Sequence, residues 1–301
     1  MVPLPIGRES RLPPRYPLLL IALSAVCFAL MGVATKLAAG YLSGGQISFA
    51  RFVAMLAPVL LVPSLRRRAT TFERGDLLLY RGVLGGLAAL IYFLAIQHIP
   101  IGLATLLNFT SPVFSVIFAA LFLREGFDPR LLAPVAVVLA GVALAAGADA
   151  PSLGAASFGR WELAALGSAV LAGAAVTAVR AARRTESSWS IYGSFSLFGL
   201  LAAAPVALVD LPARLPAIAW LWLALVAASA IAAQLLMTFA YRWVTNLQAG
   251  IVLQLTVVLS LAAGTLGLGE RLTALQTVGC AVTLAGVIGV ILLHAPPRAV
   301  T

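Results

Sequence analysis

Long apolar segments alternate with short polar turns along almost the whole chain. A membrane-spanning helix needs roughly 20 predominantly apolar residues, and ten segments approach or reach that length. They lie at residues 17–38, 46–64, 76–96, 103–123, 131–148, 161–181, 188–209, 217–238, 248–268 and 274–294. The pattern predicts an all-α integral membrane protein with ten transmembrane helices. Because the connections are short, consecutive helices are expected to be antiparallel neighbours.

The chain also contains an internal duplication. The stretch from Tyr92 to Gly141 matches the stretch from Met237 to Gly286 without a gap, at a shift of 145 positions. Ten helices in two copies give five per copy, and an odd number inverts the second copy relative to the membrane. The predicted fold is therefore two inverted-topology five-helix repeats around a central cavity, as in many secondary transporters. The repeats are expected at 17–148 and 161–294, after a cytoplasmic N-terminal tail at 1–16.

Composition supports the membrane class. The chain is 62% hydrophobic and only 10% charged, whereas a soluble domain carries about 25% charged residues. A net charge of +10 would suggest a nucleic-acid partner in a soluble chain. In a membrane protein the arginines are interpreted as topology signals, so the expected partners are lipid and a small-molecule solute, with no nucleic acid. The protein is expected to be a monomer or a homodimer.

The distribution of positive charge predicts the orientation. Lysine and arginine are enriched in cytoplasmic loops, and both termini are therefore expected in the cytoplasm of a bacterial cell, with the helices in its inner membrane. Lys36 and Arg51 flank the first outer loop and are interpreted as solvated interface anchors, the alternative being attraction of an anionic solute. The positive residues assigned to the outer ends are Lys36, Arg51, Arg160, Arg214 and Arg271.

No catalytic arrangement is evident in the sequence. Every carboxylate lies at or near the end of a predicted span, whereas an acid within the membrane core would mark an ion path. The sequence shows no clear nucleophile with an acid–base pair, no metal-binding cluster and no phosphate-binding loop. Enzyme activity, metals and cofactors are therefore not expected. Glu125 and Glu270, which the repeat relates, each precede a predicted helix, where an acid suits the positive end of the helix dipole.

One face of the fourth predicted helix is weakly polar. The residues within an arc of roughly 120° on that face are Thr105, Asn108, Ser111, Pro112 and Ser115. Pro112 removes the helical hydrogen bond to the carbonyl of Asn108. Candidates elsewhere are Gln234 on the eighth predicted helix, and Gln254, Thr256 and Ser260 on the ninth. These nine residues are predicted to line a substrate cavity. The alternative is hydrogen bonding between packed helices.

The two copies resemble a known family. The segments YFLAIQHIPIGLATLLNFTSPVFSVIFAALFLRE and FAYRWVTNLQAGIVLQLTVVLSLAAGTLGLGERL, each followed by LAGV, resemble the half-repeat of EamA-type transporters of the drug/metabolite transporter superfamily. Arg51 in ISFARF resembles an arginine that these repeats carry early in the second helix. One position departs from the pattern: Pro112 in the first copy meets Val257 in the second, so the two halves are not expected to bend alike.

The resemblance implies a carrier that exports amino acids or related metabolites by alternating access. Aromatic amino-acid exporters of the YddG kind are one candidate. Uptake carriers for a vitamin or a nucleoside-like metabolite are a second. A membrane scaffold or enzyme subunit without transport activity is the alternative from another class.

Overall fold

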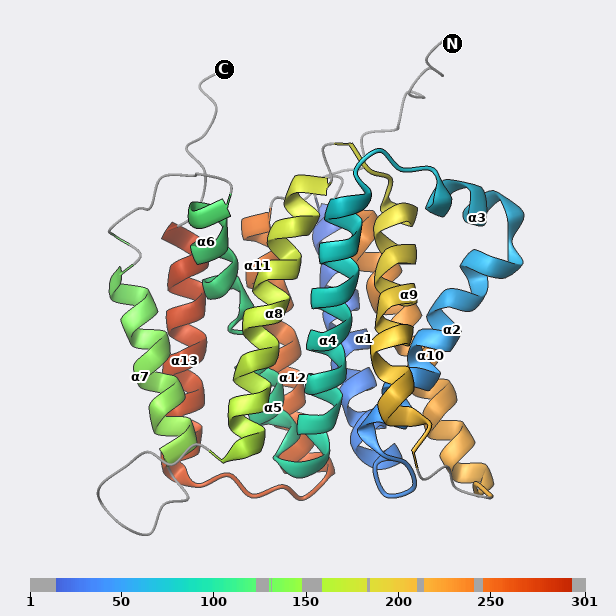
Figure 1. Ribbon diagram of the computed structural model, residues 1–301. Helices are drawn as coiled ribbons and strands as arrows, with labels where there is room; N and C mark the ends of the chain where they lie inside the picture. The colour runs from blue at the N-terminus through green and yellow to red at the C-terminus, as the bar shows by residue number, and fades with distance from the viewer. Residues whose placement is uncertain are drawn as a thin grey trace.

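The computed structural model describes residues 15–122, 130, 132–147, 159–182, 185–209, 214–240 and 246–293. These residues form a bundle of helices, without a strand in the described ranges (Figure 1). The helices are α1 (Arg15–Ala38), α2 (Gly44–Leu61), α3 (Pro63–Thr70), α4 (Gly75–His98), α5 (Ile101–Asn108), α6 (Ser111–Phe122), α7 (Leu132–Gly147), α8 (Arg160–Ala182), α9 (Ser188–Ala207), α10 (Ala217–Ala240), α11 (Asn246–Leu253), α12 (Leu255–Ala262), the π-helical η2 (Ala263–Gly267) and α13 (Ala274–Leu293). Glu125, residues 1–14 and the end positions 148 and 294 lie outside the described residues.

Six helices are long and apolar enough to cross a membrane, namely α1, α2, α4, α8, α9 and α10. Four shorter apolar stretches accompany them, at Ile101–Ser115, Leu132–Ala145, Leu255–Gly267 and Ala274–Gly289. The prediction of a multi-pass all-α membrane protein is therefore confirmed.

Several helix starts follow directly from local sequence. Ser43 and Gln46 form a capping box before α2: the Ser43 hydroxyl accepts from the Gln46 amide at 3.2 Å, and Gln46 Oε1 accepts from the Ser43 amide at 2.9 Å. Thr273 and Gln276 repeat this arrangement before α13. Ser187 caps α9 by accepting from the Ser190 amide at 3.0 Å. Such caps satisfy main-chain donors that the first turn of a helix leaves free.

The predicted span at 103–123 is two helices rather than one. α5 ends at Asn108 and α6 begins at Ser111, so Pro112 lies in the first turn of α6 and not inside a continuous helix. Proline is tolerated at that place because its missing N–H would have no helical acceptor there. Phe109 and Thr110 form the turn between the two helices.

The second repeat breaks at the equivalent place. α11 ends at Leu253 and α12 begins at Leu255, with a turn at Gln254, and η2 continues α12 as a π-helix. Both copies are therefore interrupted at the equivalent position, although Val257 stands where the first copy has Pro112. No proline lies at this break, so proline alone does not cause the interruption.

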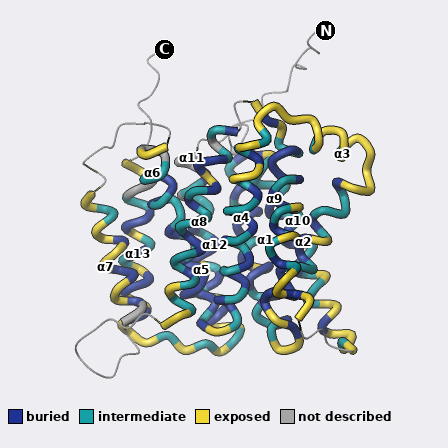
Figure 2. Tube along the Cα trace, in the orientation of Figure 1, coloured by how far each residue is buried: buried dark blue, intermediate teal, exposed yellow. Residues whose placement is uncertain are grey.

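Packing between the two repeats builds the bundle. α4 packs on α8 and α9, α1 packs on α10, α2 packs on α9, and α7 packs on α13. Glycines permit close approach at these contacts: a Cβ added at Gly86 on α4 would lie 2.6 Å from the Cα of Gly199 on α9. Figure 2 marks the exposed residues in yellow. Many of the exposed residues are large and apolar, among them Leu19, Leu201 and Leu266, as expected of a surface that contacts lipid.

Candidate functional site

The interruptions of the two broken helices meet inside the bundle. The side-chain amide of Gln254 donates to the main-chain carbonyl of Phe109 over 3.4 Å, and Gln254 is buried. The shift of 145 positions that relates the repeats places Phe109 and Gln254 at the same point of each copy. Main-chain groups released by a helix break require a partner inside a membrane protein, and here the partner comes from the opposite break.

The predicted cavity residues of α5 contact two neighbouring helices. Thr105 is fully buried, and its hydroxyl lies 2.8 Å from the hydroxyl of Tyr92 on α4. Asn108 is half-buried and donates from Nδ2 to the hydroxyl of Ser168 on α8 at 2.8 Å. The Ser168 hydroxyl in turn donates to the carbonyl of Ala165 at 2.6 Å. α5 is thus joined through side chains to both α4 and α8.

The predicted cavity residues of α6 lie against α8. Ser111 and Pro112 are half-buried, and Ser115 is buried. A Cβ added at Gly173 of α8 would lie 2.8 Å from the Ser115 nitrogen and 2.9 Å from the Ser111 carbonyl oxygen. Thr177 of α8 donates to the Ser115 carbonyl at 3.2 Å. These contacts match the packing alternative for this face of the helix.

The candidates in the second repeat are all buried. Thr256 on α12 donates to the carbonyl of Ala25 on α1 at 3.3 Å. The hydroxyl of Ser260, one turn further along α12, has no hydrogen-bond partner among the described residues. Eight of the nine candidates therefore lie at the two breaks or on the helices that flank them, Gln234 lies on α10, and Gln254 links one break to the other.

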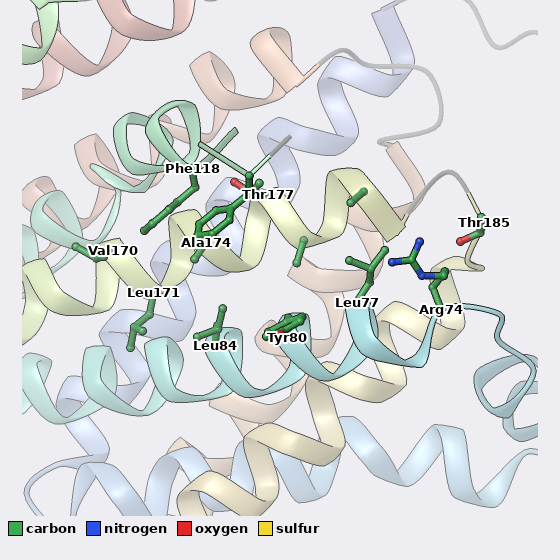
Figure 3. A pocket seen from close by; sticks show the side chains of 13 residues that line it. Arg74, Leu77, Tyr80, Leu84, Phe118, Val170, Leu171, Ala174, Thr177 and Thr185 are labelled. Atoms are coloured by element: carbon green, nitrogen blue, oxygen red, sulfur yellow. The ribbon is translucent and has the colours of Figure 1, made fainter. Parts of the chain in front are cut away.

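A cavity of about 800 Å³ opens between α4, α6 and α8 (Figure 3). That volume suits a small organic ligand. Its wall is mostly apolar and includes three aromatic rings, and it is formed by Arg74, Leu77, Tyr80, Leu84, Phe118, Phe122, Val170, Leu171, Ala174, Thr177, Ala178, Ala181 and Thr185. The nine residues predicted from sequence are not part of this wall. Phe118 and Phe122 are one helical turn apart in the sequence, so their shared helix face could have been predicted. Most of the remaining cavity wall comes from α4 and α8, which are distant in the sequence, and it could not be predicted in this way.

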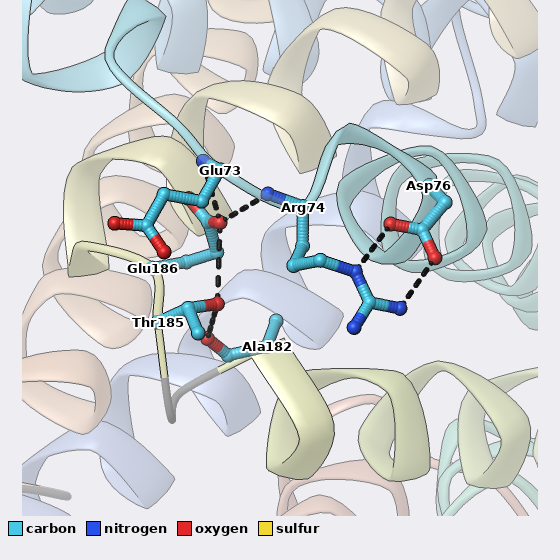
Figure 4. A network of polar contacts seen from close by, with 6 residues as sticks. All are labelled: Glu73, Arg74, Asp76, Ala182, Thr185 and Glu186. Carbon is cyan, nitrogen blue, oxygen red and sulfur yellow. Dashed lines mark hydrogen bonds and ion pairs between the residues drawn. The ribbon is translucent and has the colours of Figure 1, made fainter.

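A polar network borders this cavity at the upper end of the bundle in Figure 1, where α4 begins and α8 ends (Figure 4). Glu186 Oε1 accepts from the main-chain amides of Glu73 and Arg74, at 2.9 and 2.6 Å. Arg74 forms an exposed ion pair with Asp76, with 2.7 Å between Nη2 and Oδ2. These hydrogen bonds connect the α3–α4 loop to the α8–α9 loop. The guanidinium of Arg74 thereby lies at the rim of the cavity.

The opposite end carries a second polar cluster. Glu270 accepts from the amide of Ile101, the first residue of α5, at 2.9 and 3.1 Å. Lys36 lies 3.3 Å from Glu270 and donates to the carbonyls of Ile96 and Ile99 at 2.8 Å each. The carboxylate does lie at the positive end of a helix, but that helix is α5 of the other repeat and not the following α13. The interpretation of Lys36 as a solvated anchor is wrong, because it binds the end of α4.

Arg51 is also misplaced by the sequence interpretation. It lies within α2 with 3% of its surface exposed, so it is not a solvated anchor at an outer end. Its guanidinium carbon lies 4.7, 5.2 and 5.5 Å from the ring centroids of Phe52, Phe93 and Phe195. Cation–π contacts of this kind were not visible in the sequence, because the rings come from three helices.

In the described part of the chain, no three or more histidine, cysteine, aspartate or glutamate side chains lie together in a way that could hold a metal ion. The site is thus made of amide, hydroxyl, aromatic and arginine groups.

Comparison with known proteins extends these observations. The pseudopaline exporter CntI of Pseudomonas aeruginosa is 30% identical over 190 residues, which cover 62% of this chain and 65% of the exporter, just under two thirds of its length. An uncharacterized transporter of Helicobacter pylori is 31% identical over 128 residues, covering 42% of this chain and 43% of that protein. Human solute carrier family 35 member G1 is 33% identical over 87 residues, 28% of this chain and 24% of that carrier.

Similarity in fold extends further than similarity in sequence. A solved crystal structure matches with a TM-score of 0.64 and 20% identity, covering 92% of this chain and 96% of that one. The model of the EamA-like transporter family matches twice, at residues 15–147 and 159–292. The two matches follow the duplication seen in the sequence. The chain therefore belongs to the EamA-like transporter family.

Proposed function

We propose that the protein is a secondary carrier that exports amino acids or related small metabolites across the bacterial inner membrane by alternating access. The observation that carries this proposal is the pair of broken helices, interrupted at equivalent positions and linked by Gln254 and Phe109. Interrupted helices at the boundary between two repeats form the solute site of many secondary transporters. The named relative that exports a metabolite supports this direction of transport.

The proposal includes ten spans in two inverted repeats, at 17–148 and 161–294. Ten spans result when α5 with α6, and α11 with α12 and η2, are each counted as one and α3 as a connecting helix. The equivalent caps of α2 and α9 support the inversion. Gly44, next to Ser43, donates to Gln97 at the end of α4, whereas Glu186, next to Ser187, accepts from the amide of Arg74 at the start of α4. Equivalent helix starts thus lie at opposite ends of α4.

Orientation follows from charge. Arg66, Arg67 and Arg68 lie on exposed α3, at the same end of the bundle as Arg74. Positive residues favour the cytoplasmic face, so we assign this end and both termini to the cytoplasm. The cavity between α4, α6 and α8 lies toward that end, and the Lys36–Glu270 cluster lies at the other. An opening to the cytoplasm with a closed far end is the state in which an exporter loads its solute.

The cavity supports a solute with an apolar or aromatic part. The aromatic residues Tyr80, Phe118 and Phe122 line it. Arg74 and Thr185 offer polar groups near its rim, as Figure 3 shows. Aromatic rings bury apolar surface with a preferred geometry. We place the nine predicted residues deeper along the path, around the two breaks, where helices must move if access is to alternate between the two faces.

Reconstitution tests the function directly. Purified full-length protein in liposomes is expected to move at least one radiolabelled amino acid from a panel that also includes vitamins and nucleosides, and Gln254→Leu should slow that flux. Flux of only a vitamin or a nucleoside would contradict the amino-acid assignment. No flux of any solute, together with co-purification of a partner enzyme, would support a scaffold and overturn the carrier proposal.

A further inference from the structure

Arg51 lies deep inside the protein, away from both ends of its helix. It is the eighth residue after the cap Ser43, about 12 Å along the axis of α2 at 1.5 Å per residue. Phe195 is likewise the eighth residue after Ser187, the cap of α9, and the two side chains are in cation–π contact. The meeting point therefore lies well within the bundle. A charged residue at such a depth in a membrane protein is costly and marks a candidate functional site.

The surroundings of Arg51 attract a cation but give its buried Nε no hydrogen-bond acceptor among the described residues. The rings of Phe52, Phe93 and Phe195 lie near the guanidinium. Ring faces favour a positive charge, whereas the five N–H donors of arginine require oxygen acceptors in the plane of the group. Arg81 approaches the same Phe195 ring, at 4.2 Å from its centroid. Two guanidinium groups, of Arg51 and Arg81, therefore approach one ring.

Two buried donors on α2 lack a partner. The Nε of Arg51 and the hydroxyl of Ser48 have no hydrogen-bond partner among the described residues, and Ser48 is fully buried. They are three residues apart in a helix, so they lie on the same face, one turn from each other. The ion pairs of the described residues, Lys36–Glu270 and Arg74–Asp76, do not include Arg51. Buried polar groups nearly always have partners, so this face requires an acceptor from outside the described chain.

We propose that Arg51 and Ser48 bind the carboxylate group of the transported solute, an inference that rests on the proposed function. A carboxylate accepts hydrogen bonds without donating any, and the fork of an arginine side chain matches its two oxygens. The serine hydroxyl supplies a further donor. The aromatic rings around Arg51 exclude water, which strengthens the interaction between opposite charges. The site therefore selects a solute that carries an acid group, and it rejects the corresponding amide.

Ligand binding tests the site apart from transport. Thermal unfolding of the purified full-length protein is followed with benzoate, with benzamide, and with chloride at equal ionic strength. Benzoate is expected to raise the midpoint temperature of unfolding, whereas benzamide and chloride are expected to leave it unchanged. Ser48→Ala should weaken the apparent benzoate affinity several-fold, and Arg51→Gln at least tenfold, since hydrogen bonds to charged groups are the stronger class. The absence of a benzoate effect in the parent protein, or an equal effect of chloride, overturns the proposal.

A matched arginine provides the control. Arg160 also contacts a ring, with its guanidinium carbon 5.1 Å from the Trp161 centroid, but it is exposed at the start of α8. Arg160→Gln should leave the benzoate response unchanged. If Arg51→Gln does not fold, Ser48→Ala and Arg51→Lys decide the question, because both preserve the buried positive charge while removing donors. Parent-like benzoate affinity in both folded variants overturns the site.

Flux measurements separate this inference from the proposed function. In liposomes, L-phenylalanine is expected to be transported faster than L-phenylalaninamide, and Ser48→Ala should reduce that preference. If the protein binds benzoate through Arg51 but transports neither compound, the carboxylate site is supported and the proposed transport of amino acids is contradicted. A protein that transports both compounds equally, with no effect of either substitution, would remain a carrier without a carboxylate site.

Discussion

Gln254 donates its side-chain amide to the main-chain carbonyl of Phe109, and these two residues occupy the same position in the two repeats. The hydrogen bond joins the break between α5 and α6 to the break between α11 and α12. Motion of one repeat against the other must therefore preserve this contact or break it.

Replacing Gln254 by leucine tests that role. The variant keeps a similar volume but loses the donor, so we expect a slower maximal rate of flux with little change in the solute concentration at half-maximal rate. The loss in stability should be about 0.5–1.5 kcal/mol, as for a neutral hydrogen bond. Thermal unfolding and initial rates in liposomes measure both. Thr265→Val is the control, because Thr265 is exposed and bonds within its own helical segment. Parent-like rates in Gln254→Leu would contradict the proposed role.

Glu270 is expected to matter mainly for stability. Glu270→Ala removes the acceptor for the Ile101 amide and the partner of Lys36, which should cost roughly 1–3 kcal/mol. Glu270→Gln keeps an acceptor and should cost less. Asp76→Ala is the control, since an exposed ion pair contributes little to stability. Thermal unfolding of the three variants gives the comparison. A stable Glu270→Gln protein that has lost gradient-driven flux would instead identify Glu270 as the coupling residue.

Asn108→Leu distinguishes a solute contact from a helix contact. Asn108 bonds to Ser168, so Ser168→Ala removes the helix partner while keeping the amide. If Asn108 binds solute, Asn108→Leu should weaken apparent affinity a few-fold to roughly tenfold, and Ser168→Ala should not. Equal effects of both substitutions would show that Asn108 acts through α8. Affinity is measured by inhibition of flux with unlabelled solute.

Pro112→Ala tests the break before α6. The substitution restores a main-chain donor and removes the restriction on the preceding residues, so α5 and α6 should become more continuous. We expect a slower maximal rate of flux and an unchanged apparent affinity. Pro134→Ala, at an early position of α7, is the control because it alters a proline away from the breaks. An unchanged rate in Pro112→Ala would show that this break does not limit transport.

Filling the cavity should block transport. Ala174 lines the cavity on α8, and Ala174→Phe places a ring in the space between α4 and α6. Flux is expected to fall at least tenfold while the protein still folds, because the added side chain occupies volume needed by the solute. Ala143→Phe, on an exposed position of α7, is the matched control. If Ala174→Phe transports solute at the rate of the parent protein, this cavity is not part of the transport path.

The assigned orientation can be measured with a membrane-impermeant thiol reagent on intact cells. In a variant that lacks Cys27 and Cys280, cysteine at Tyr41 should react from outside and cysteine at Thr70 should not. Tyr41 is exposed after α1, and Thr70 is exposed at the end of α3. Labelling of position 70 from outside would reverse the assignment.

The sequence by itself determined the membrane class and the duplication. Apolar length and low charge are properties of the chain alone, and a helix in lipid satisfies its own main-chain groups. Helix caps such as the pair Ser43 and Gln46 likewise depend only on residues that are close together in the sequence. Repetition at a fixed shift needs no structure to be recognised, and the family match at 15–147 and 159–292 follows it.

Tertiary structure decided how distant polar groups find partners. Glu270 precedes α13 in the chain but caps α5, because helix packing brings that N-terminus to it. Arg51 is enclosed by rings from α2, α4 and α9 rather than exposed to water. Hydrophobic periodicity specifies which residues avoid water, but not which helices become neighbours. The pairing of polar side chains depends on those neighbours, and it therefore became visible only in the folded bundle.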